Sequence, residues 1–324
     1  MNAESTTDVA SVSALCATTM PSGGNHLCGT RSKALSALVR FVLSVRSLGP
    51  ARVATKLVRR VSSRITRPAA TLLRPDSNLD LLRRCSWLEK TPQIRIIDSA
   101  VTQDDLARFQ IQMNYPRFYY RAERRIRYSL WHCVGTALSG LDRASIVIDV
   151  GAQAGLWGSM IRRRFGCRVF DVDLEYKPGR HGFRIGAPAS SIPIESGSVS
   201  HVVSFCAFNC FEGDDDTAMI LEAARVLVPG GKLVIVPLCI GDEYVNLYDP
   251  RLIASVERLD RGARPAVLAD WGNKFGRWYD RHAFEQRILR HAGAFDTEIH
   301  RVSHPFNSHE GFDAMYAVRL IRRP

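Results

Sequence analysis

The stretch Ser145-Ile-Val-Ile-Asp-Val-Gly-Ala-Gln-Ala-Gly155 decides the fold that this sequence predicts. Up to Val150 it is a short apolar run with β-branched residues, which is typical of a strand buried in a parallel sheet. A glycine turn follows, and the next residues predict a helix over about 155–165. In an open parallel sheet, ligands bind beyond the carboxyl ends of the strands, so this turn is the expected place for one.

The downstream residues repeat the alternation of strand and helix. Apolar runs predict strands at 167–173, 199–208 and 232–237. A helix is expected over 215–227, and Val228-Pro229-Gly230-Gly231 predicts a helix stop and a tight turn. This alternation predicts an α/β fold with a parallel sheet and helices on both faces.

The C-terminal third is less regular. Residues 242–275 contain prolines and several glycines, which predict an irregular insertion with one short helix near 251–259. A helix is expected over 281–292. The strand-like stretches 295–302 and 314–321 predict a terminal antiparallel pair.

Candidate ligand-binding residues cluster at the ends of the first two predicted strands. Gly151 can take a positive φ and lets a ligand approach the backbone, and the following helix presents free N–H groups. Asp173 ends the second strand, where an acid can accept hydrogen bonds from both hydroxyls of a ribose. Asp171 would point to the same side of the sheet but lies farther from the strand end. Together these residues predict a ligand that contains a nucleoside.

Three segments resemble a class I S-adenosylmethionine-dependent methyltransferase with a type-11-like methyltransferase domain. Residues 146–155 are similar to the family's glycine-rich first motif, and residues 168–174 to its second strand with the ribose-binding acid. Ala223-Ala-Arg-Val-Leu-Val-Pro-Gly-Gly-Lys-Leu-Val-Ile-Val236 closely matches its late motif, and 192–199 resembles the stretch before the fourth strand. The resemblance covers about 120–320.

The resemblance implies a Rossmann-like class I methyltransferase sheet and methyl transfer from S-adenosylmethionine to an acceptor of unknown identity. It implies cofactor-binding roles for Asp149, Gly151, Gln153, Gly155, Asp173 and Asn209. It gives no catalytic residue, which is consistent with an activated cofactor that needs mainly to be positioned against a nucleophile.

The sequence departs from the family pattern at three places. Gln153 stands where the family usually has glycine, and the place near Ala187 lacks the acid that often reads the adenine amino group. Ser200 and His201 replace the Asp that commonly opens the fourth strand. Gln153 and Ala187 support the rival hypothesis, a catalytically inactive methyltransferase-like domain that acts in binding or assembly.

Other reaction chemistry finds less support in the sequence. The spacing of Gly151, Gly155 and Gly158 does not fit the G-x-G-x-x-G fingerprint of a dinucleotide oxidoreductase. No metal is expected, because Cys206 and Cys210 lack further ligands at suitable spacing. The acids Glu212 and Asp214–Asp216 are better explained as the first turn of a helix.

Single histidines and one aromatic cluster keep two interpretations open. His132, His201 and His282 could each serve as a general base, but isolated histidines are more often simply packed or exposed. The cluster from Trp271 to Asp280 predicts either a lid over the substrate or a small core that pins the insertion.

The net charge of +12 comes mostly from one segment. Residues 31–70 hold ten Lys and Arg and no acid, whereas residues 1–30 hold two acids and no base. This argues against a nucleic-acid-binding role for the main domain. Residues 33–48 and 51–66 each predict an amphipathic helix. This basic pair either lies on an anionic membrane surface, or it docks on its own domain or stays mobile. An organelle transit peptide is a third alternative, against which the absence of Lys and Arg in residues 1–30 argues.

The cysteines and the first residues indicate a compartment. Eight cysteines are scattered without a C-x-x-C pair, and the start of the chain lacks a signal-peptide pattern. We therefore expect a cytoplasmic protein with reduced thiols. If residues 31–70 bind a membrane surface, the protein would lie at the membrane periphery. The expected organisation is a disordered tail at 1–30, a basic amphipathic helical segment at 31–70, a connector at 71–116 and a methyltransferase-like α/β domain at 117–324.

Overall fold

The structure is a computed structural model that describes residues 85–100, 140–153, 156–249, 252, 259–267, 273–303 and 316–324. The expected disordered tail and the helices at 33–48 and 51–66 lie outside the described residues. The helix expected at 117–140 does too, apart from its last residue, and so does nearly all of the short helix near 251–259.

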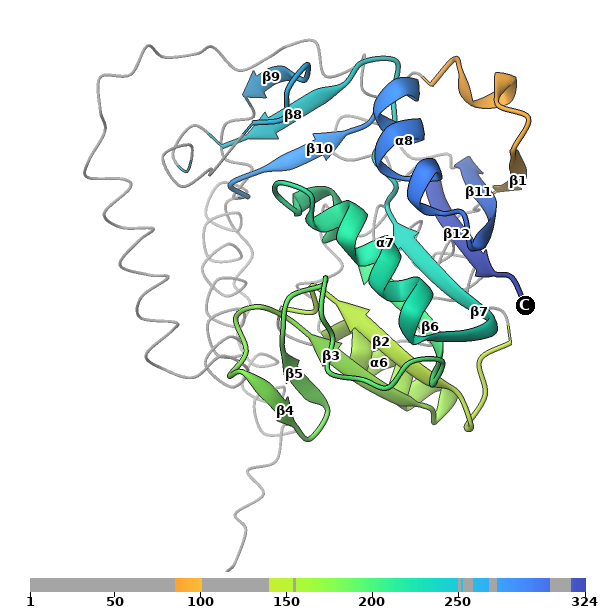
Figure 1. Cartoon of the computed structure of the whole chain (residues 1–324), viewed down its shortest axis with the longest axis vertical. Coiled ribbons are helices and arrows are strands. Elements are labelled where there is room, and N and C mark those ends of the chain that lie inside the picture. The colour runs from red at the N-terminus through yellow and green to blue at the C-terminus, as the bar shows by residue number, and fades with distance from the viewer. Residues whose placement is uncertain are drawn as a thin grey trace, which may run out of the picture.

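The described residues form a nine-stranded sheet and a second, three-stranded sheet (Figure 1). The large sheet has the order β1-β11-β12-β7-β6-β2-β3-β5-β4. Its strands are β1 (Ile94–Ala100), β2 (Ile146–Val150), β3 (Arg168–Val172), β4 (Gly179–His181), β5 (Arg184–Gly186), β6 (Val199–Phe205), β7 (Leu227–Val236), β11 (Phe295–Ser303) and β12 (Tyr316–Arg322). The parallel strands β2, β3, β6 and β7 confirm the predicted parallel core.

The strand order reverses next to β2. From β2 the chain passes outward to β3 and β5, then returns to β6 on the other side and continues to β7. Strand β2 is hydrogen-bonded in parallel to both β3 and β6. Such a reversal leaves a crevice at the carboxyl ends of the strands, where ligands bind in open α/β sheets.

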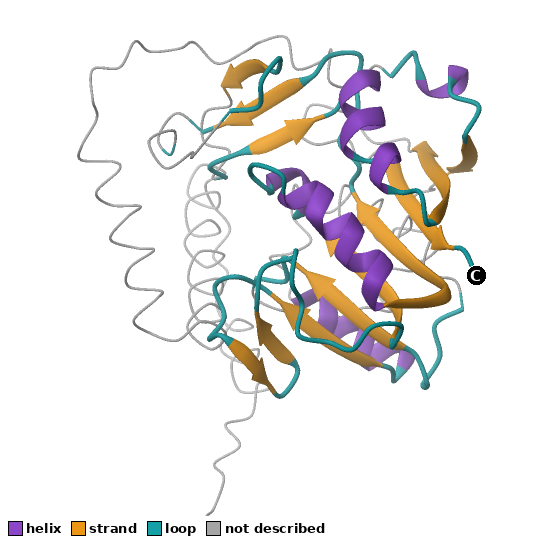
Figure 2. Ribbon diagram, viewed as in Figure 1, coloured by secondary structure: helices purple, strands orange, loops and turns teal. Residues whose placement is uncertain are grey.

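Helices cover both faces of the sheet, as the sequence predicts. Helix α6 (Leu156–Phe165) lies behind the strands in Figure 2, and α7 (Asp215–Val226) lies in front. Helix α8 (Arg281–Arg287) begins at Asp280, whose side chain accepts from the Ala283 N–H at 2.7 Å, a typical N-cap. The described residues also form short 3-10 helices, namely η2 (Leu88–Lys90), η4 (Phe208–Cys210) and η6 (Leu289–His291).

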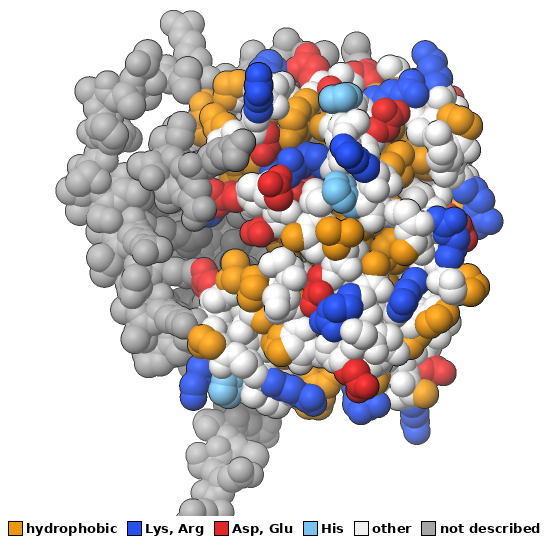
Figure 3. Space-filling model, in the orientation of Figure 1, with side chains coloured by type: hydrophobic (Ala, Val, Ile, Leu, Met, Phe, Trp, Pro, Cys, Tyr) orange, Lys and Arg blue, Asp and Glu red, His pale blue; other side chains and the backbone are white. Residues whose placement is uncertain are grey.

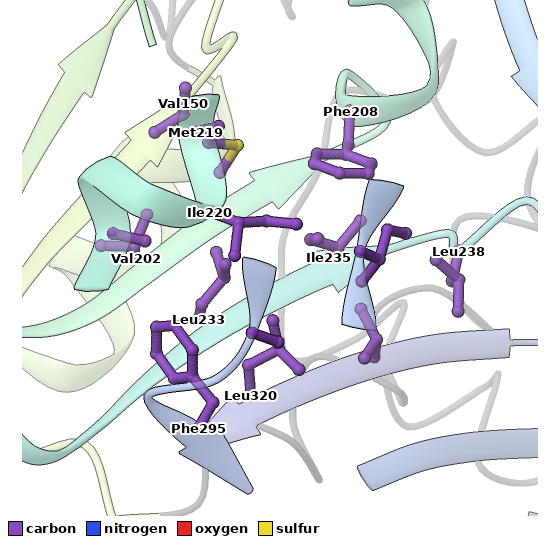
Figure 4. Close-up of a cluster of buried hydrophobic side chains, with 14 of the residues drawn as sticks. Val150, Val202, Phe208, Met219, Ile220, Leu233, Ile235, Leu238, Phe295 and Leu320 are labelled. Atoms are coloured by element: carbon purple, nitrogen blue, oxygen red, sulfur yellow. The ribbon is translucent and has the colours of Figure 1, made fainter. Parts of the chain in front are cut away.

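The face towards α7 holds the hydrophobic core. A single register row runs through Ile148, Val202, Leu233 and Leu320, all fully buried. These residues pack with Met219 and Ile220 of α7 and with Phe295, as Figure 4 shows.

The opposite face carries charged groups in the next register row. Because side chains alternate along a strand, Asp149, Asp171, Arg319 and Glu298 share the face that lies towards α6. Three of these side chains are buried in the structure, since Asp149, Asp171 and Glu298 are at most 5% exposed. The two faces of the sheet are therefore chemically different.

Residues 85–100 belong to the sheet and not to a connector. Strand β1 pairs in parallel with β11 at the edge of the sheet, and Trp87, Leu88 and Ile94 are buried in the main core. The Trp87 indole N–H also donates to the Gly241 carbonyl at 2.7 Å. The boundary expected at 117 is therefore wrong for this segment, because its pairing partner lies about 200 residues away in the sequence.

Short strands also replace parts of the expected irregular insertion. Strands β8 (Val245–Tyr248), β9 (Arg264–Val267) and β10 (Gly276–Trp278) form the three-stranded sheet, in the order β10-β8-β9. The antiparallel β4–β5 pair follows β3 directly. The terminal antiparallel pair predicted near 295–302 and 314–321 is confirmed as β11 and β12.

The expected tight turn after α7 is incorporated into a strand. The helix ends at Val226 and β7 starts at Leu227, so Pro229, Gly230 and Gly231 lie within β7. The β6–β7 register shifts between Val199 and His201, and Gly230 takes a φ of 75°. The Pro-Gly-Gly stretch thus forms an irregularity within the strand and not a separate turn.

The described surface is mixed in charge on the face shown in Figure 3. Blue and red side chains alternate there over the described residues. Among the helices in the described ranges, none has the length and apolar character needed to cross a membrane.

Gly158 is predicted to be essential for packing α6 on the charged face of the sheet. A Cβ atom at this position would lie 1.9 Å from Oδ1 of Asp171. We expect Gly158→Ala to lower the free energy of unfolding by about 1–3 kcal/mol through overpacking. Denaturant titration followed by circular dichroism measures this change.

Gly293→Ala is the matched control, because a Cβ there meets nothing within 4 Å and φ lies outside the left-handed region. It should change stability by less than about 0.5 kcal/mol. Equal effects of the two substitutions would contradict the assigned helix–sheet contact.

Candidate functional site

The predicted ligand-binding turn lies at the crevice where the strand order reverses. Gly151 follows β2 and has a φ of 78°. Its N–H donates to the Val172 carbonyl at 2.9 Å, and the Ala152 N–H donates to the same oxygen at 3.1 Å. The turn is therefore tied to the carboxyl end of β3.

Gly151 also touches the loop that follows β6. A Cβ at Gly151 would lie 2.4 Å from Cβ of Ala207 and 3.7 Å from Cε1 of Phe211. Both its positive φ and this close approach require glycine. The ends of β2, β3 and β6 thus meet around one residue.

Gln153 keeps the backbone shape that a glycine would supply. It has a φ of 49°, its N–H donates to Oδ2 of Asp173 at 2.8 Å, and its carbonyl accepts from the Tyr176 hydroxyl at 2.7 Å. Its side chain is exposed. The departure from the family pattern therefore changes the side chain at the turn, while the left-handed conformation is retained.

Asp173 is placed at the crevice but is already engaged with the backbone. Its Oδ1 accepts from the Glu175 N–H at 2.9 Å, and its Oδ2 accepts from Gln153. The carboxylate is half-buried. Asp173 therefore also fixes the turn, and its role in ribose binding stays a prediction.

Asp171 is separated from the crevice, in agreement with the choice of Asp173. It is 2% exposed, and Arg162 of α6 donates to its Oδ2 at 3.1 Å. Burial raises the pKa of the Asp171 carboxyl, although Arg162 opposes this. Its Oδ1 makes no hydrogen bond to the described part of the protein.

Asp149 lies beside Asp171 in the same register row. It is 2% exposed, and burial raises its pKa well above the usual carboxyl range. The charges of Asp171 and Asp173 raise it further, whereas Arg162 lowers it. Asp149 therefore contributes to the support behind the turn.

Of the other two predicted cofactor-binding positions, Asn209 lies within the described residues and Gly155 lies outside them. Asn209 lies in η4 at the end of the loop after β6, and it is 5% exposed. Gly155 lies outside the described residues, directly before α6.

The structure adds residues that the sequence analysis did not include. Tyr176 is 3% exposed and holds the Gln153 carbonyl, while Cys206 follows β6 with a φ of 56°. Positive φ in non-glycine residues is uncommon and clusters at functional sites. A tyrosine three residues after Asp173 carries no motif by itself, and backbone strain has no sequence pattern, so neither could be found from the sequence.

The Cys210 thiol near the crevice is unsuited to nucleophilic chemistry, because burial disfavours its thiolate. Cys206, Cys210 and Cys239 are free cysteines, and burial raises the pKa of Cys210 to about 12. In the described ranges, no three His, Cys, Asp or Glu side chains are grouped as a metal site.

His201 lies away from the crevice, whereas the described part of the cluster 271–280 packs beside the loop after β6. His201 is at the amino-terminal end of β6, and burial, helped by Lys232, lowers its pKa to about 4. Phe275, Trp278 and Tyr279 are at most 8% exposed, which favours the small-core interpretation for these residues. Trp271 and His132 are outside the described residues.

We predict that Gln153→Gly leaves the protein at least as stable as the wild type. A left-handed conformation costs a non-glycine residue roughly 1–2 kcal/mol, which offsets the greater entropy that glycine loses on folding. Gln153→Val should be less stable, because β-branched residues fit poorly at positive φ. Thermal unfolding of the purified variants measures the order.

Gln286→Gly provides the control, since Gln286 lies inside α8. There glycine should lower stability by about 1 kcal/mol. If Gln153→Gly were equally destabilising, the assigned backbone conformation at 153 would be incorrect.

Comparison with known proteins identifies the domain around this crevice. Residues 148–235 match a family described as a methyltransferase domain. The match runs from β2 to β7 and includes Gly151, Asp173 and the loop after β6. No curated protein sequence matches the chain.

Several solved structures resemble the chain at low sequence identity. The complex between the Haloferax volcanii Trm112 methyltransferase activator and the putative methyltransferase gives 14% identity and a TM-score of 0.40, over 69% of this chain and 98% of that chain. Burkholderia thailandensis 1,6-didemethyltoxoflavin-N1-methyltransferase, with bound 1,6-didemethyltoxoflavin and S-adenosylhomocysteine, gives 14% and 0.40, over 70% and 94%. The family match covers residues 148–235, and these residues include the strands on both sides of the reversal beside β2.

Proposed function

We propose that the protein transfers a methyl group from S-adenosylmethionine to an acceptor nucleophile. The observation that carries the proposal is the junction at Gly151, where the ends of β2, β3 and β6 meet at the reversal of strand order. This is the place where open α/β sheets bind ligands. The match of residues 148–235 to a methyltransferase domain supplies the reaction class.

The residues at the junction fit such a cofactor. The half-buried carboxylate of Asp173 lies at the end of β3, where an acid can accept hydrogen bonds from the ribose hydroxyls. The glycine at 151 lets the loop after β6 approach the turn, which brings the ends of β2, β3 and β6 together where the cofactor is proposed to bind. Asn209 and Gly155 are proposed as further cofactor contacts, and Asp149 as support for the turn.

Positioning accounts for most of the proposed catalysis. When bound, the cofactor supplies a methyl group that is already activated by its sulfonium. The protein then needs to hold the acceptor atom in line with this methyl group and to exclude water, which can lower the barrier by about 7–11 kcal/mol. No general base is assigned, because His201 lies at the far end of β6 and is kept neutral by burial.

A second candidate is a binding domain without transferase activity. Gln153 and Ala187 replace family residues, and both oxygens of Asp173 already accept backbone N–H groups. Under this hypothesis the same fold would be retained while the cofactor no longer binds. Calorimetric titration of the full chain with S-adenosylmethionine separates the candidates, since absence of heat and of thermal stabilisation at millimolar cofactor favours the binding domain.

Asp173→Ala should weaken cofactor binding strongly. Losing hydrogen bonds to a charged acceptor costs about 1.5–3 kcal/mol, which corresponds to roughly 10- to 150-fold in the dissociation constant. Asp173→Asn should fall between the wild type and Asp173→Ala, because the amide oxygen still accepts. Titration calorimetry gives the three constants.

Glu195→Ala is the control for this series. Glu195 is exposed and lies before β6, at the opposite end of that strand from the crevice. Its affinity for the cofactor should equal that of the wild type. An unchanged constant in Asp173→Ala would rule out the ribose assignment.

The basic segment 31–70 is proposed to contact anionic membranes. Each Lys or Arg near such a surface contributes about 1 kcal/mol, and salt screens the attraction. The full chain should co-sediment with anionic vesicles more than with neutral ones, and the triple variant Arg59→Gln, Arg60→Gln and Arg64→Gln should bind less. Equal binding of the two proteins would favour docking of the segment on its own domain.

A further inference from the structure

A buried ion network lies beside the crevice and includes no residue of the proposed cofactor site. Arg277 of β10 is completely buried. Its Nε donates to Oδ2 of Asp260 at 2.6 Å and its Nη2 to Oδ1 of Asp260 at 2.9 Å, which is a bidentate pair. Its Nη1 also lies 2.9 Å from Oδ2 of Asp216, in the first turn of α7.

The same guanidinium holds the loop that forms one wall of the crevice. Nη1 donates to the Phe211 carbonyl at 2.9 Å, and Nη2 donates to the Gly213 carbonyl at 3.0 Å. The Phe211 ring is the group that would lie 3.7 Å from a Cβ at Gly151, and it packs on Phe208 with centroids 5.8 Å apart. Arg277 is therefore one residue away from the junction of the three strand ends.

The partners of Arg277 are themselves fixed. Arg287 contacts both oxygens of Asp216, at 2.9 and 2.6 Å, and the Tyr279 hydroxyl donates to Asp216 at 2.8 Å. Asn246 of β8 donates to Asp260 at 2.8 Å and accepts the Asp260 N–H at 2.7 Å. Arg287 also lies 3.3 Å from Oδ1 of Asp214, an exposed carboxylate, so each arginine of the network has more than one carboxylate partner or carbonyl acceptor.

This network joins two parts of the structure that differ in role. Asp260 and Asn246 belong to the region of the three-stranded sheet, whereas Phe211, Gly213 and Asp216 connect η4 to α7 beside the crevice. Figure 1 shows β10 next to the start of α7. Buried ion pairs add little net stability compared with apolar packing, but they specify one geometry. The geometry that Arg277 specifies is the position of the wall from Ala207 to Gly213.

We propose that Arg277 is a positioning residue for the crevice, which holds the wall 207–213 against Gly151 and links its position to the three-stranded sheet. Only one part of this proposal rests on the proposed function, namely the effect of Arg277 on the affinity for S-adenosylmethionine. Its structural part, the placement of the wall by one guanidinium, can be measured without any ligand.

Arg277→Lys is the sharpest test because it keeps the charge and loses the fork. An ammonium is a point charge and cannot reproduce the planar set of donors that serves Asp260 and two carbonyls together. Phe275 and Tyr279 lie 5.1 and 5.9 Å from the guanidinium carbon and would still enclose the side chain. Arg264→Lys is the matched control. Arg264 is the first residue of β9 and pairs with Glu243, and both side chains are 39% exposed.

Alkylation of Cys210 reports the position of the wall. Cys210 lies in η4 within the wall, is partly buried, and has a pKa raised to about 12, so it should react slowly in the wild type. Iodoacetamide labelling of the full chain, followed by peptide mass mapping, gives its rate. Cys167, buried beside the start of β3, is the internal reference for general unfolding.

In Arg277→Lys we expect Cys210 to react at least tenfold faster while Cys167 is unchanged, and S-adenosylmethionine to bind about tenfold more weakly. Arg264→Lys should leave all three quantities as in the wild type. A lower melting temperature with unchanged Cys210 reactivity and unchanged affinity would show that Arg277 is only structural, and this would overturn the proposal.

Two further outcomes are assigned in advance. If the wild type binds no cofactor, the proposed function fails, and the ratio of the Cys210 and Cys167 rates still decides the role of Arg277. If Arg277→Lys does not fold, Asp260→Asn replaces it, because the amide keeps one acceptor for the arginine. Faster labelling of Cys210 alone in that variant supports the proposal, and equal acceleration of both cysteines overturns it.

Discussion

The absence of a side chain at Gly151 is the constraint on which the crevice depends. The chain leaves β2 there and turns with a φ of 78°, which lets two consecutive N–H groups reach the Val172 carbonyl. The same residue admits Ala207 to a distance that no Cβ would permit. One position thus joins β2 to β3 and lets the end of β6 approach, and any larger residue would separate at least one of the three strand ends.

The two faces of the central sheet have different roles. One face carries the hydrophobic core, and the other carries buried carboxyl groups behind the site. The row through Ile148, Val202 and Leu233 packs on α7 and supplies the close-packed core. One residue farther along, Asp149 and Asp171 carry carboxyl groups into the other face, where burial raises the pKa of both. Isolated buried charges are costly, so this face requires Arg162 and a close approach of α6 at Gly158.

The elements with local patterns could be predicted from the sequence. Strands β2 and β3, helices α6 and α7, and the pair β11–β12 each have an apolar run or a helical period within their own residues. Strand β1 was assigned to a connector because only its partner β11, far along the chain, places it in the sheet. Strands β8, β9 and β10 are three or four residues long and lie among prolines and glycines, where periodicity is too short to detect.

The site was predicted by residue type more successfully than by role. Asp173 is at the crevice as expected, but its hold on the Gln153 N–H depends on a backbone conformation that the sequence does not reveal. Gln153 illustrates the same limit on prediction. A glycine in a motif provides both a positive φ and the absence of a side chain, and Gln153 retains only the positive φ. Arg277 lies within the cluster 271–280 that the sequence indicates, but its role could not be predicted because its partners come from separate segments of the chain.

Strain and buried charge gather on the same edge of the sheet. Gln153 and Cys206 are the non-glycine residues with positive φ in the described ranges, and they follow β2 and β6, on the two sides of the reversal. Strained residues persist only where the surrounding structure fixes them. Tyr176 and Asp173 fix the first by hydrogen bonds, and the Cys206 N–H is fixed by the Val236 carbonyl at 2.7 Å. Because apolar packing alone specifies no such conformations, an edge built this way is better explained by ligand geometry than by stability.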